Sequence, residues 1–257
     1  MINHETAALS SSIAEEQTGV GRVRMLIEKL SLPSGPEQSE TALYLRVYRE
    51  LREALMAGAV APGDLLNIRP IAAALRTSPM PVREALGRLA AEGALEPLAN
   101  RAFRVPVIGP DRYRELLLIR LRLEGLASEH AAAHVTTEEL AALRRIHAAI
   151  VADARLSMRL YLALNRQFHF GIYRAARLPT LMEMIELIWL RIGPLLHACH
   201  APSDIGVAIA CHGETLAALE RGDGPAAGRA LQQDMLHGST SILNSLASTP
   251  AAADRDR

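Results

Sequence analysis

The stretch S-P-M-P-V-R-E-A-L-G-R-L-A-A-E-G, Ser78 to Gly93, decides how the first part of this chain folds. Ser78 suits a helix N-cap, because its hydroxyl can accept a hydrogen bond from a free backbone N–H of the first turn. Pro79 suits the first helical position, where its missing N–H costs little, and Gly93 suits a left-handed stop. Between them one apolar stripe follows helical spacing: Val82, Ala85, Leu86, Leu89 and Ala90.

The segments on either side extend this helix into a larger motif. A short helix is expected before it, over Ile68–Leu75, with only Arg76 and Thr77 between the two. Two short helices joined by so tight a turn are typical of a helix-turn-helix. Two strands joined by a turn are expected after it, over Ala94–Leu98 and Phe103–Val107. The order of helix, turn, helix and ribbon predicts a winged DNA-binding domain.

Two motifs in this region carry a resemblance to a known family. They are L-R-E-A-L-M-A-G-A-V-A-P-G-D-L-L, Leu51–Leu66, and P-V-R-E-A-L-G-R-L-A-A-E-G-A-L, Pro81–Leu95. With them the segment Thr41–Val107 resembles the GntR family of bacterial transcription regulators. The resemblance implies that the second helix of the pair enters the major groove of DNA, and that the wing reaches toward the minor groove.

The resemblance also implies which side chains meet DNA. Arg83 lies one turn inside the reading helix and can bond a guanine edge bidentately, whereas Arg52 and Arg69 are placed to touch phosphates, which position the protein without specifying sequence. Other candidates lie at the start of the reading helix and on the wing. The expected DNA-binding residues are Arg52, Arg69, Ser78, Met80, Arg83, Arg101 and Arg104.

Two positions depart from the pattern of that family. The family usually has Ser-Arg-Thr-Pro-Val-Arg-Glu, whereas this chain has Ser78-Pro79-Met80-Pro81-Val82-Arg83-Glu84. Pro79 and Met80 thus replace a basic donor and a hydroxyl, and Ala102 stands where a wing glycine is expected. These changes leave the fold intact, but they open the alternative of a degenerate regulator that binds DNA weakly.

Composition sets outer limits on the class of protein. The 257 residues are 49% hydrophobic, with a formal net charge of zero. Thr41–Val105 holds nine arginines against six acidic residues, so the DNA argument depends on the motif and not on charge. Two cysteines imply no disulfide framework. Neither a run of 18 apolar residues nor a signal-peptide core is present, so a cytoplasmic protein without membrane contact is expected.

The chain divides into four expected segments. Residues 1–40 are expected to form a flexible N-terminal extension, 41–108 the winged helix-turn-helix domain, 109–248 a helical effector-binding and dimerisation domain, and 249–257 a disordered tail. From Asp111 onward every segment is predicted to be helical. The expected helices span Asp111–His134, Thr136–Ala154, Ser157–Ala176, Thr180–His197 with Pro194 bending or ending it, Ser203–Glu220 and Ala226–Leu246. The fold class is therefore mainly α.

The helical domain carries a second resemblance. Its motifs are L-x-x-I-R-L-R-L-E-G-L-A (Leu116–Ala127), N-R-Q-F-H (Asn165–His169) and H-G-E-T-L-A-A-L-E-R-G-D (His212–Asp223). They are similar to the FCD subgroup, the FadR-like regulators of GntR type. That resemblance implies a bundle that forms a homodimer, holds a small effector that is often an organic acid, and in many members binds a divalent metal through one Asp and three His.

Carried over residue by residue, the metal ligands of the subgroup fall on Asn165, His169, His212 and Asp234. Asn165 and His169 stand at i and i+4 and share one helix face. Two imidazoles, a carboxylate and an amide oxygen suit zinc, manganese or nickel. The alternative is a polar pocket whose histidines bind the effector, or water, without metal. His130 with His134, and His197 with Cys199 and His200, are rival sets without ligand spacing.

A small carboxylate effector would also need a cationic partner. Arg120 stands where the subgroup often directs an arginine into the cavity, and a guanidinium suits a carboxylate. The alternative is a surface ion pair between Arg120 and Glu124. Arg191, Trp189 and Tyr161 are further lining candidates, although core packing explains the two aromatic residues equally well. The expected effector-binding residues are Arg120, Asn165, His169, Arg191 and His212.

These patterns favour a ligand-responsive, dimeric transcriptional regulator that binds double-stranded operator DNA. The alternative from another class is a metal-dependent helical-bundle enzyme. The chain lacks paired Glu-x-x-His elements, a nucleophile motif and glycine-rich phosphate loops, so no enzymatic activity is expected.

Overall fold

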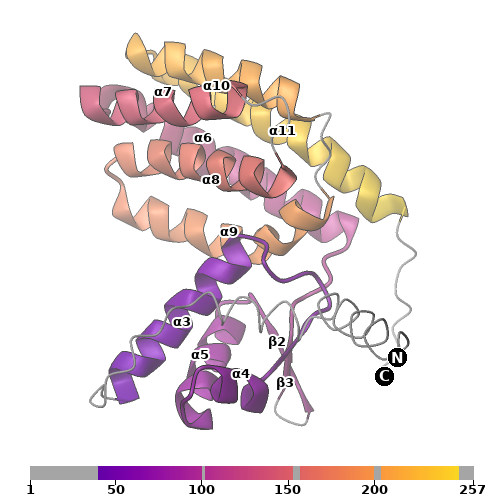
Figure 1. Ribbon diagram of the computed structural model, residues 1–257. Helices are drawn as coiled ribbons and strands as arrows, with labels where there is room; N and C mark the ends of the chain where they lie inside the picture. The colour runs from indigo at the N-terminus through magenta and orange to yellow at the C-terminus, as the bar shows by residue number, and fades with distance from the viewer. Residues whose placement is uncertain (1–39, 100–101, 153–156, 200–203, 249–257) are drawn as a thin grey trace, which may run out of the picture. The chain divides into compact units, whose positions relative to one another are not determined.

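The computed structural model describes residues 40–99, 102–152, 157–199 and 204–248 (Figure 1). It divides into two compact units: one holds Met1–Val107 with Leu190–Ala198, and the other holds Ile108–Trp189 with Cys199–Arg257. The expected extension and tail lie almost entirely outside the described residues. The mainly helical fold class, with a winged helix-turn-helix followed by a helical bundle, is confirmed.

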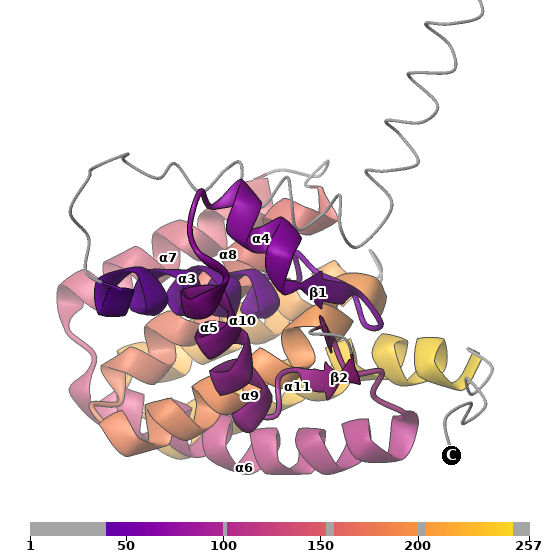
Figure 2. The same cartoon turned by 90° about the horizontal axis from the view of Figure 1, so that it is seen from below.

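The first unit is a three-helix head with a small sheet. Helix α5 packs against α3 and α4. The sheet has the order β1-β3-β2, with both pairs antiparallel. Strand β1 was not expected from the sequence; its Leu66 lies opposite Phe103 of β3, and α4 follows it directly (Figure 2). The elements are α3 (Glu40–Met56), β1 (Leu65–Asn67), α4 (Ile68–Ala74), α5 (Pro79–Ala91), β2 (Glu96–Leu98) and β3 (Ala102–Arg104).

Helix α5 confirms the predicted apolar stripe. Val82, Ala85, Leu86 and Leu89 are all 0% exposed. Gly93 takes φ +74 and supplies the left-handed stop. The predicted capping bond of Ser78 is wrong: Ser78 is the N-cap residue, but its side chain makes no cap hydrogen bond. Pro81 occupies the third helical position, so one of the two backbone N–H groups that usually donate to an N-cap side chain is missing.

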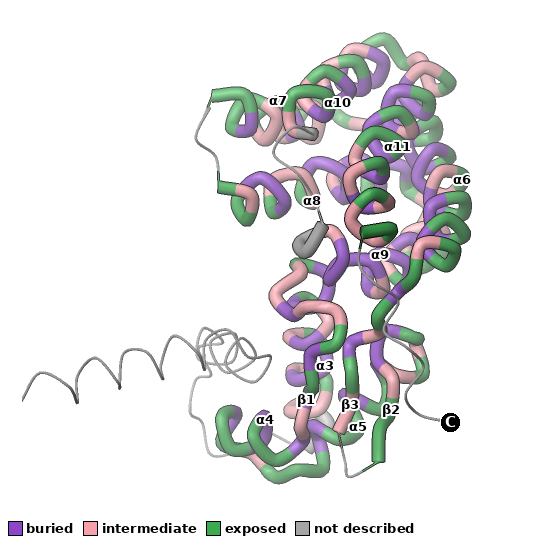
Figure 3. Tube along the Cα trace, turned by 90° about the vertical axis from the view of Figure 1, so that its right-hand side faces the viewer, coloured by how far each residue is buried: buried purple, intermediate pink, exposed green. Residues whose placement is uncertain are grey.

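The second unit contains helices and no strand among the residues that the structure describes in it, as predicted. Helix α6 packs against α11 and α8, α11 packs against α10, and α7 packs against α8 and α10. Exposed residues run along one side of α6 and buried ones along the other (Figure 3). The helices are α6 (Pro110–His134), α7 (Thr137–Ala152), α8 (Met158–Ala175), α9 (Pro179–Cys199), α10 (Asp204–Glu220) and α11 (Gly224–Ser248).

Local chemistry explains where these helices begin. Helix α6 begins at Pro110, one residue before the expected start at Asp111, because Pro110 suits the first helical position after the N-cap residue Gly109. Helix α7 begins at a capping box: Glu139 N–H donates to Thr136 Oγ1 at 3.2 Å, and Thr136 N–H donates to Glu139 Oε2 at 3.0 Å. Pro194 lies inside α9, which does not end there. Within the described residues, no helix is long and apolar enough to cross a bilayer.

Candidate functional site

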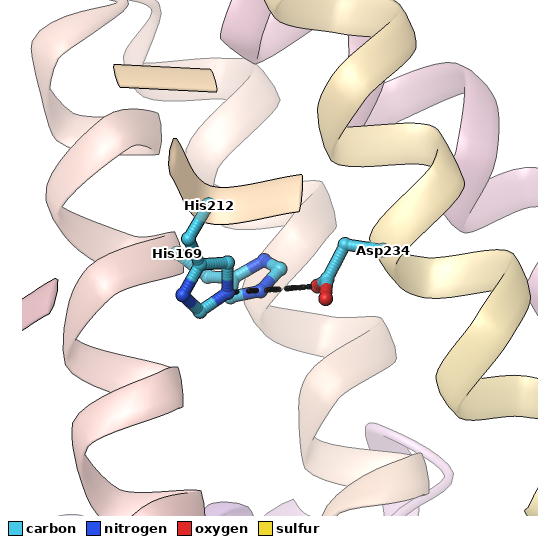
Figure 4. Close-up of side chains that lie close together, drawn as sticks. All are labelled: His169, His212 and Asp234. Carbon is cyan, nitrogen blue, oxygen red and sulfur yellow. Dashed lines mark ion pairs between the residues drawn. The ribbon is translucent and has the colours of Figure 1, made fainter. Parts of the chain in front are cut away.

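Three side chains from three helices of the second unit converge on one point (Figure 4). His169 lies on α8, His212 on α10 and Asp234 on α11. One ligand atom of each lies within 4.8 Å of the others. His169 Nε2 is 2.9 Å from Asp234 Oδ2, and His212 Nε2 is 3.8 Å from the same oxygen. The structure thus brings together three of the four predicted metal ligands.

The helix faces explain why these polar groups are buried. In α11 the buried residues Leu231, Asp234 and Met235 stand at i, i+3 and i+4, so the carboxylate belongs to an apolar face. In α10, His212 is buried beside Cys211 and Thr215. Packing of the apolar faces therefore brings the polar groups inward with them.

The surroundings of Asp234 and His212 shift the pKa values of both side chains. Burial raises the pKa of Asp234, but His169 and His212 outweigh it and hold that pKa well below its usual range. Burial lowers the pKa of His212, and Asp234 only partly offsets this effect. The site therefore combines a carboxylate with a neutral imidazole that has a lone pair, which are ligands that a borderline divalent cation accepts.

Buried polar atoms without a hydrogen-bond partner gather in the same unit. An atom of this kind is uncommon in a protein interior and costs about 1–3 kcal/mol. Those of His169 and His212 belong to the converging group, and Asn165 lies one turn before His169 on α8. The donor set fits a bound cation or polar ligand. The atoms are Ser128 Oγ, His147 Nδ1, Asn165 Oδ1, His169 Nε2 and both ring nitrogens of His212.

His147 of α7 is a site residue that the sequence reasoning missed. Its ring centroid lies 6.1 Å from that of His212 and 6.4 Å from that of Phe168. Burial lowers its pKa, and His212 lowers it further, so the imidazole stays neutral. The signal was present in the sequence, because Leu143, His147 and Ile150 stand at i, i+4 and i+7 on one helix face.

Arg120 and Glu124 form a buried ion pair, so the surface alternative is wrong. Their side chains are 5% and 1% exposed, and Arg120 Nε donates to Glu124 Oε1 at 2.6 Å. Burial works against the charged guanidinium, but Glu124 outweighs it and raises the pKa of Arg120. The Arg120 guanidinium carbon also lies 5.1 Å from the ring centroid of Trp189.

The other residues expected to line an effector pocket have partners outside the converging group of His169, His212 and Asp234. Arg191, in the first unit, donates from Nε and Nη2 to the Glu92 backbone carbonyl, at 3.1 and 2.9 Å. Tyr161 belongs to a hydrophobic cluster with Ile150 and Leu162, which fits the packing explanation. Among the rival sets, His130 and His134 stack with centroids 6.4 Å apart, outside the converging group. The side chains of His197, Cys199 and His200 lie outside the described ones.

In the first unit, most of the expected DNA-binding residues are accessible. Arg69, Ser78, Met80 and Arg83 are exposed, and Arg52 is half-buried. On the wing, Arg104 pairs with Glu96 at 2.8 Å, and Arg101 lies outside the described residues. The side of α5 opposite the core stripe therefore points to solvent, and Arg83 lies on it.

Comparisons with known proteins agree with both units. The family model of the bacterial regulatory proteins of the gntR family matches residues 43–105, and that of the FCD domain matches residues 115–237. The chain is similar to the HTH-type transcriptional regulator McbR of Escherichia coli (strain K12), with 34% identity over 75% of this chain and 89% of the relative.

Solved structures give the same result. The structure of E. coli McbR/YncC matches with a TM-score of 0.74 and 33% identity, over 80% of this chain and 98% of that one. A GntR-type regulator from Rhodococcus sp. RHA1 matches with a TM-score of 0.65 and 23% identity, over 79% of this chain and 98% of that one, which supports the fold alone.

These relatives are regulators, so the enzymatic alternative is wrong and the prediction of no enzymatic activity is confirmed. The winged head corresponds to the DNA-binding domain of these regulators, and the helical unit corresponds to their FCD domain. The chain therefore belongs to the GntR family of bacterial regulatory proteins, and is a DNA-binding transcriptional regulator with a C-terminal FCD domain.

Proposed function

We propose that this regulator binds a divalent cation (zinc, manganese or nickel) through Asn165, His169, His212 and Asp234, and senses a small carboxylate effector there. The observation that carries the proposal is the buried convergence of His169, His212 and Asp234. The regulator acts in the cytoplasm on a double-stranded DNA operator. Effector binding changes its affinity for that operator.

The residues of the chain divide the work at this site. Asp234 supplies the negative charge, and the two imidazoles supply neutral nitrogen lone pairs. A bound divalent cation would provide a positive anchor for a carboxylate group. The ring centroid of His147 lies 6.1 Å from that of His212, and its buried Nδ1 offers a further hydrogen-bonding group. Arg120 and Arg191 remain predicted effector-binding residues, although both guanidinium groups already have partners.

The regulator acts as a homodimer that places two winged heads on the half-sites of a near-palindromic operator. Three large apolar side chains of α6 are left exposed, Leu118 at 59%, Ile119 at 39% and Leu126 at 42%. An apolar patch of this kind supports a protein interface. The effector must prefer one arrangement of the heads, because equal affinity for both would shift nothing. Operator binding then changes effector affinity by the same factor.

A thermal-unfolding series tests the metal site. The protein is stripped with EDTA, dialysed, and unfolded with ZnCl2, MnCl2 or NiCl2. A cation that binds only the folded state raises the midpoint, and we expect the rise to disappear in His169→Ala and His212→Ala. His237→Ala is the matched control, because His237 is exposed on α11. A midpoint that no cation moves in the native protein contradicts the metal proposal.

The same thermal-unfolding series distinguishes a pocket that binds the effector through a metal from a pocket whose histidines bind it without metal. Succinate is added as a dicarboxylate probe, with and without the cation. A rise in midpoint that needs the cation supports the metal-anchored effector. A rise of equal size in EDTA supports the alternative, in which the histidines bind the carboxylate without metal.

A second candidate is a regulator that binds DNA only weakly. Its supporting observation is Met80, which is 52% exposed at the first turn of α5, where it offers no hydrogen bond to a base or phosphate. The test is selection of duplexes from a random pool by the native protein and by the double variant Pro79→Arg, Met80→Thr. Enrichment by the double variant alone favours this candidate; enrichment by the native protein rejects it.

A further inference from the structure

The hydroxyl of Tyr173 lies between His169 and Glu124 in the interior of the second unit. It is 2.9 Å from His169 Nδ1, and it donates a short hydrogen bond to Glu124 Oε2. Tyr173 and His169 are each 1% exposed, and they stand at i and i+4 on α8. A continuous chain of polar contacts therefore leads from Glu124 to the ring of His169.

Glu124 is held as an acceptor. Arg120 donates to both of its carboxylate oxygens, at 2.6 Å to Oε1 and 3.3 Å to Oε2. Trp189 Nε1 donates to Oε1 at 3.2 Å. A carboxylate paired with a guanidinium is ionised and has no proton to give. The hydrogen bond between Tyr173 and Glu124 must then use the proton of the tyrosine hydroxyl.

This assignment fixes the protonation of His169. A hydroxyl has one proton, and that of Tyr173 is committed to Glu124, so its oxygen can only accept from His169. The proton in that second bond comes from His169 Nδ1–H. In a neutral imidazole the other nitrogen, Nε2, then carries a lone pair.

The surroundings of Nε2, on the opposite side of the His169 ring, agree with donation from Nδ1–H to Tyr173. His169 Nε2 lies 2.9 Å from Asp234 Oδ2, yet it has no aligned hydrogen bond to that oxygen or to any other described atom. In this tautomer Nε2 and Asp234 Oδ2 both offer lone pairs, so a cation bound between or beside them would satisfy both atoms. An imidazole whose other nitrogen donates to a fixed acceptor is the arrangement that orients histidine toward a metal.

We propose that Tyr173, anchored by Glu124 and Arg120, is a positioning residue that holds His169 in the Nδ1–H tautomer and presents its Nε2 lone pair to a divalent cation beside Asp234. The inference rests on the proposed function for the identity of the cation. It also gives Arg120 a role in the site, as the counter-charge that keeps Glu124 an acceptor.

Nitrogen NMR of the metal-free native protein tests the tautomer directly. The ring signals of His169 are assigned by their loss in His169→Gln. We expect a protonated Nδ1 and an unprotonated Nε2. A His169 that is protonated on Nε2 or on both nitrogens, donating to Asp234, overturns the proposal. This measurement does not depend on any variant at Tyr173 folding.

The variant Tyr173→Phe removes the hydroxyl and leaves the ring. We expect His169 to change to the Nε2–H tautomer, because Nδ1 loses its partner and Asp234 remains as an acceptor. Zn²⁺ affinity by calorimetry should fall about 10–100-fold, the usual cost of losing such an orienting partner. Tyr161→Phe is the matched control: it removes a buried hydroxyl from the same helix, in a different cluster, and should leave both readouts unchanged.

The two proposals fail in different ways. Zn²⁺ binding that is equal in native protein and Tyr173→Phe overturns the positioning role and leaves the metal site standing. A native protein that binds no Zn²⁺, but whose His169 changes tautomer in Tyr173→Phe, supports the positioning role and contradicts the metal site.

Discussion

The ring of Phe168 stacks on the ring of His212, with centroids 4.0 Å apart and planes 19° apart. Phe168 is 0% exposed and precedes His169 directly on α8. Neighbouring residues of this helix therefore supply one histidine of the site and the ring that packs against the other. The stack restricts the plane of an imidazole whose ring nitrogens have no hydrogen-bond partner among the residues that the structure describes. The stack with Phe168 therefore orients the His212 ring, as we propose that Tyr173 orients the His169 ring.

Phe168→Leu should therefore loosen His212. We expect Zn²⁺ affinity to fall several-fold, and the free energy of unfolding of the metal-free protein to fall by about 1–3 kcal/mol, as for most core substitutions. Calorimetry and urea unfolding measure the two effects. Leu162→Ala is the control, since Leu162 is a buried residue of the same helix in the cluster with Ile150 and Tyr161. Equal Zn²⁺ affinity in the native protein and Phe168→Leu would show that the stack does not orient His212.

Asn165→Asp should tighten metal binding. Within the described part of the chain, the site holds the single carboxylate of Asp234, and the buried Oδ1 of Asn165 has no hydrogen-bond partner. A second anionic oxygen one turn before His169 adds charge attraction to the cation, and we expect Zn²⁺ affinity to rise at least about tenfold, or 1.4 kcal/mol. Gln167→Glu adds the same charge on the exposed side of α8 and should change little. Affinity that does not rise in Asn165→Asp would exclude Asn165 from the ligand set.

Substitution of two arginines of the winged head should change DNA affinity in different ways. With a duplex selected by the native protein, Arg83→Ala should cost about 1–3 kcal/mol and relax the preference at one base pair. Arg69→Ala should weaken all duplexes alike and lower the slope of log affinity against log salt by about one. Fluorescence anisotropy at several salt concentrations measures both, with Arg229→Ala, exposed on α11, as the control. Uniform weakening by Arg83→Ala would remove it from base recognition.

The capping box of α7 should respond to acid. The backbone N–H of Thr136 lowers the pKa of Glu139, and Arg177 at 2.9 Å lowers it further, against an opposing effect of burial. A carboxyl with a depressed folded pKa stabilises the fold above its unfolded pKa of about 4.3, and loses that stabilisation as the pH falls through the folded value.

Glu139→Gln should therefore lower the thermal midpoint at pH 7, and the difference should shrink as the pH falls below the unfolded pKa and through the lowered folded pKa. The free-energy difference at pH 7 should stay below about 1 kcal/mol, because the pair with Arg177 is partly solvent-screened. Glu138→Gln, in the same turn and exposed, is the control. A difference that persists unchanged at pH 3 would mean that the carboxylate charge does not matter.

The exposed apolar residues of α6 should be needed for the dimer. In Leu118→Glu, Leu126→Glu two charges enter that patch, and we expect the mass by light scattering to halve and affinity for a palindromic duplex to fall. Leu160→Glu is the control, because Leu160 is 48% exposed on α8. An unchanged mass in the double variant would place the dimer interface elsewhere.

Prediction from the sequence succeeded where neighbouring residues decide the outcome. The apolar stripe of α5 and the stop at Gly93 depend on spacing within a few residues, and both are in the structure. His169, His212 and Asp234 were assigned through the resemblance to a family, and the structure brings them together. Asn165 shares the helix face of His169 on α8, but its part in binding stays a prediction.

The sequence by itself determined the helices, the winged head and the polar residue types of the site, because periodicity and caps act over one or two turns. Only the tertiary structure decided that β1 pairs with β3, that Arg120 and Glu124 are buried together, and that His147 and Tyr173 border the histidines. The pairing of β1 with β3 and the approach of His147 to His212 join residues far apart in the chain, and the burial of Arg120 with Glu124 depends on the helices that cover them. Their partners are chosen by the packing of whole helices and strands, which no local pattern encodes.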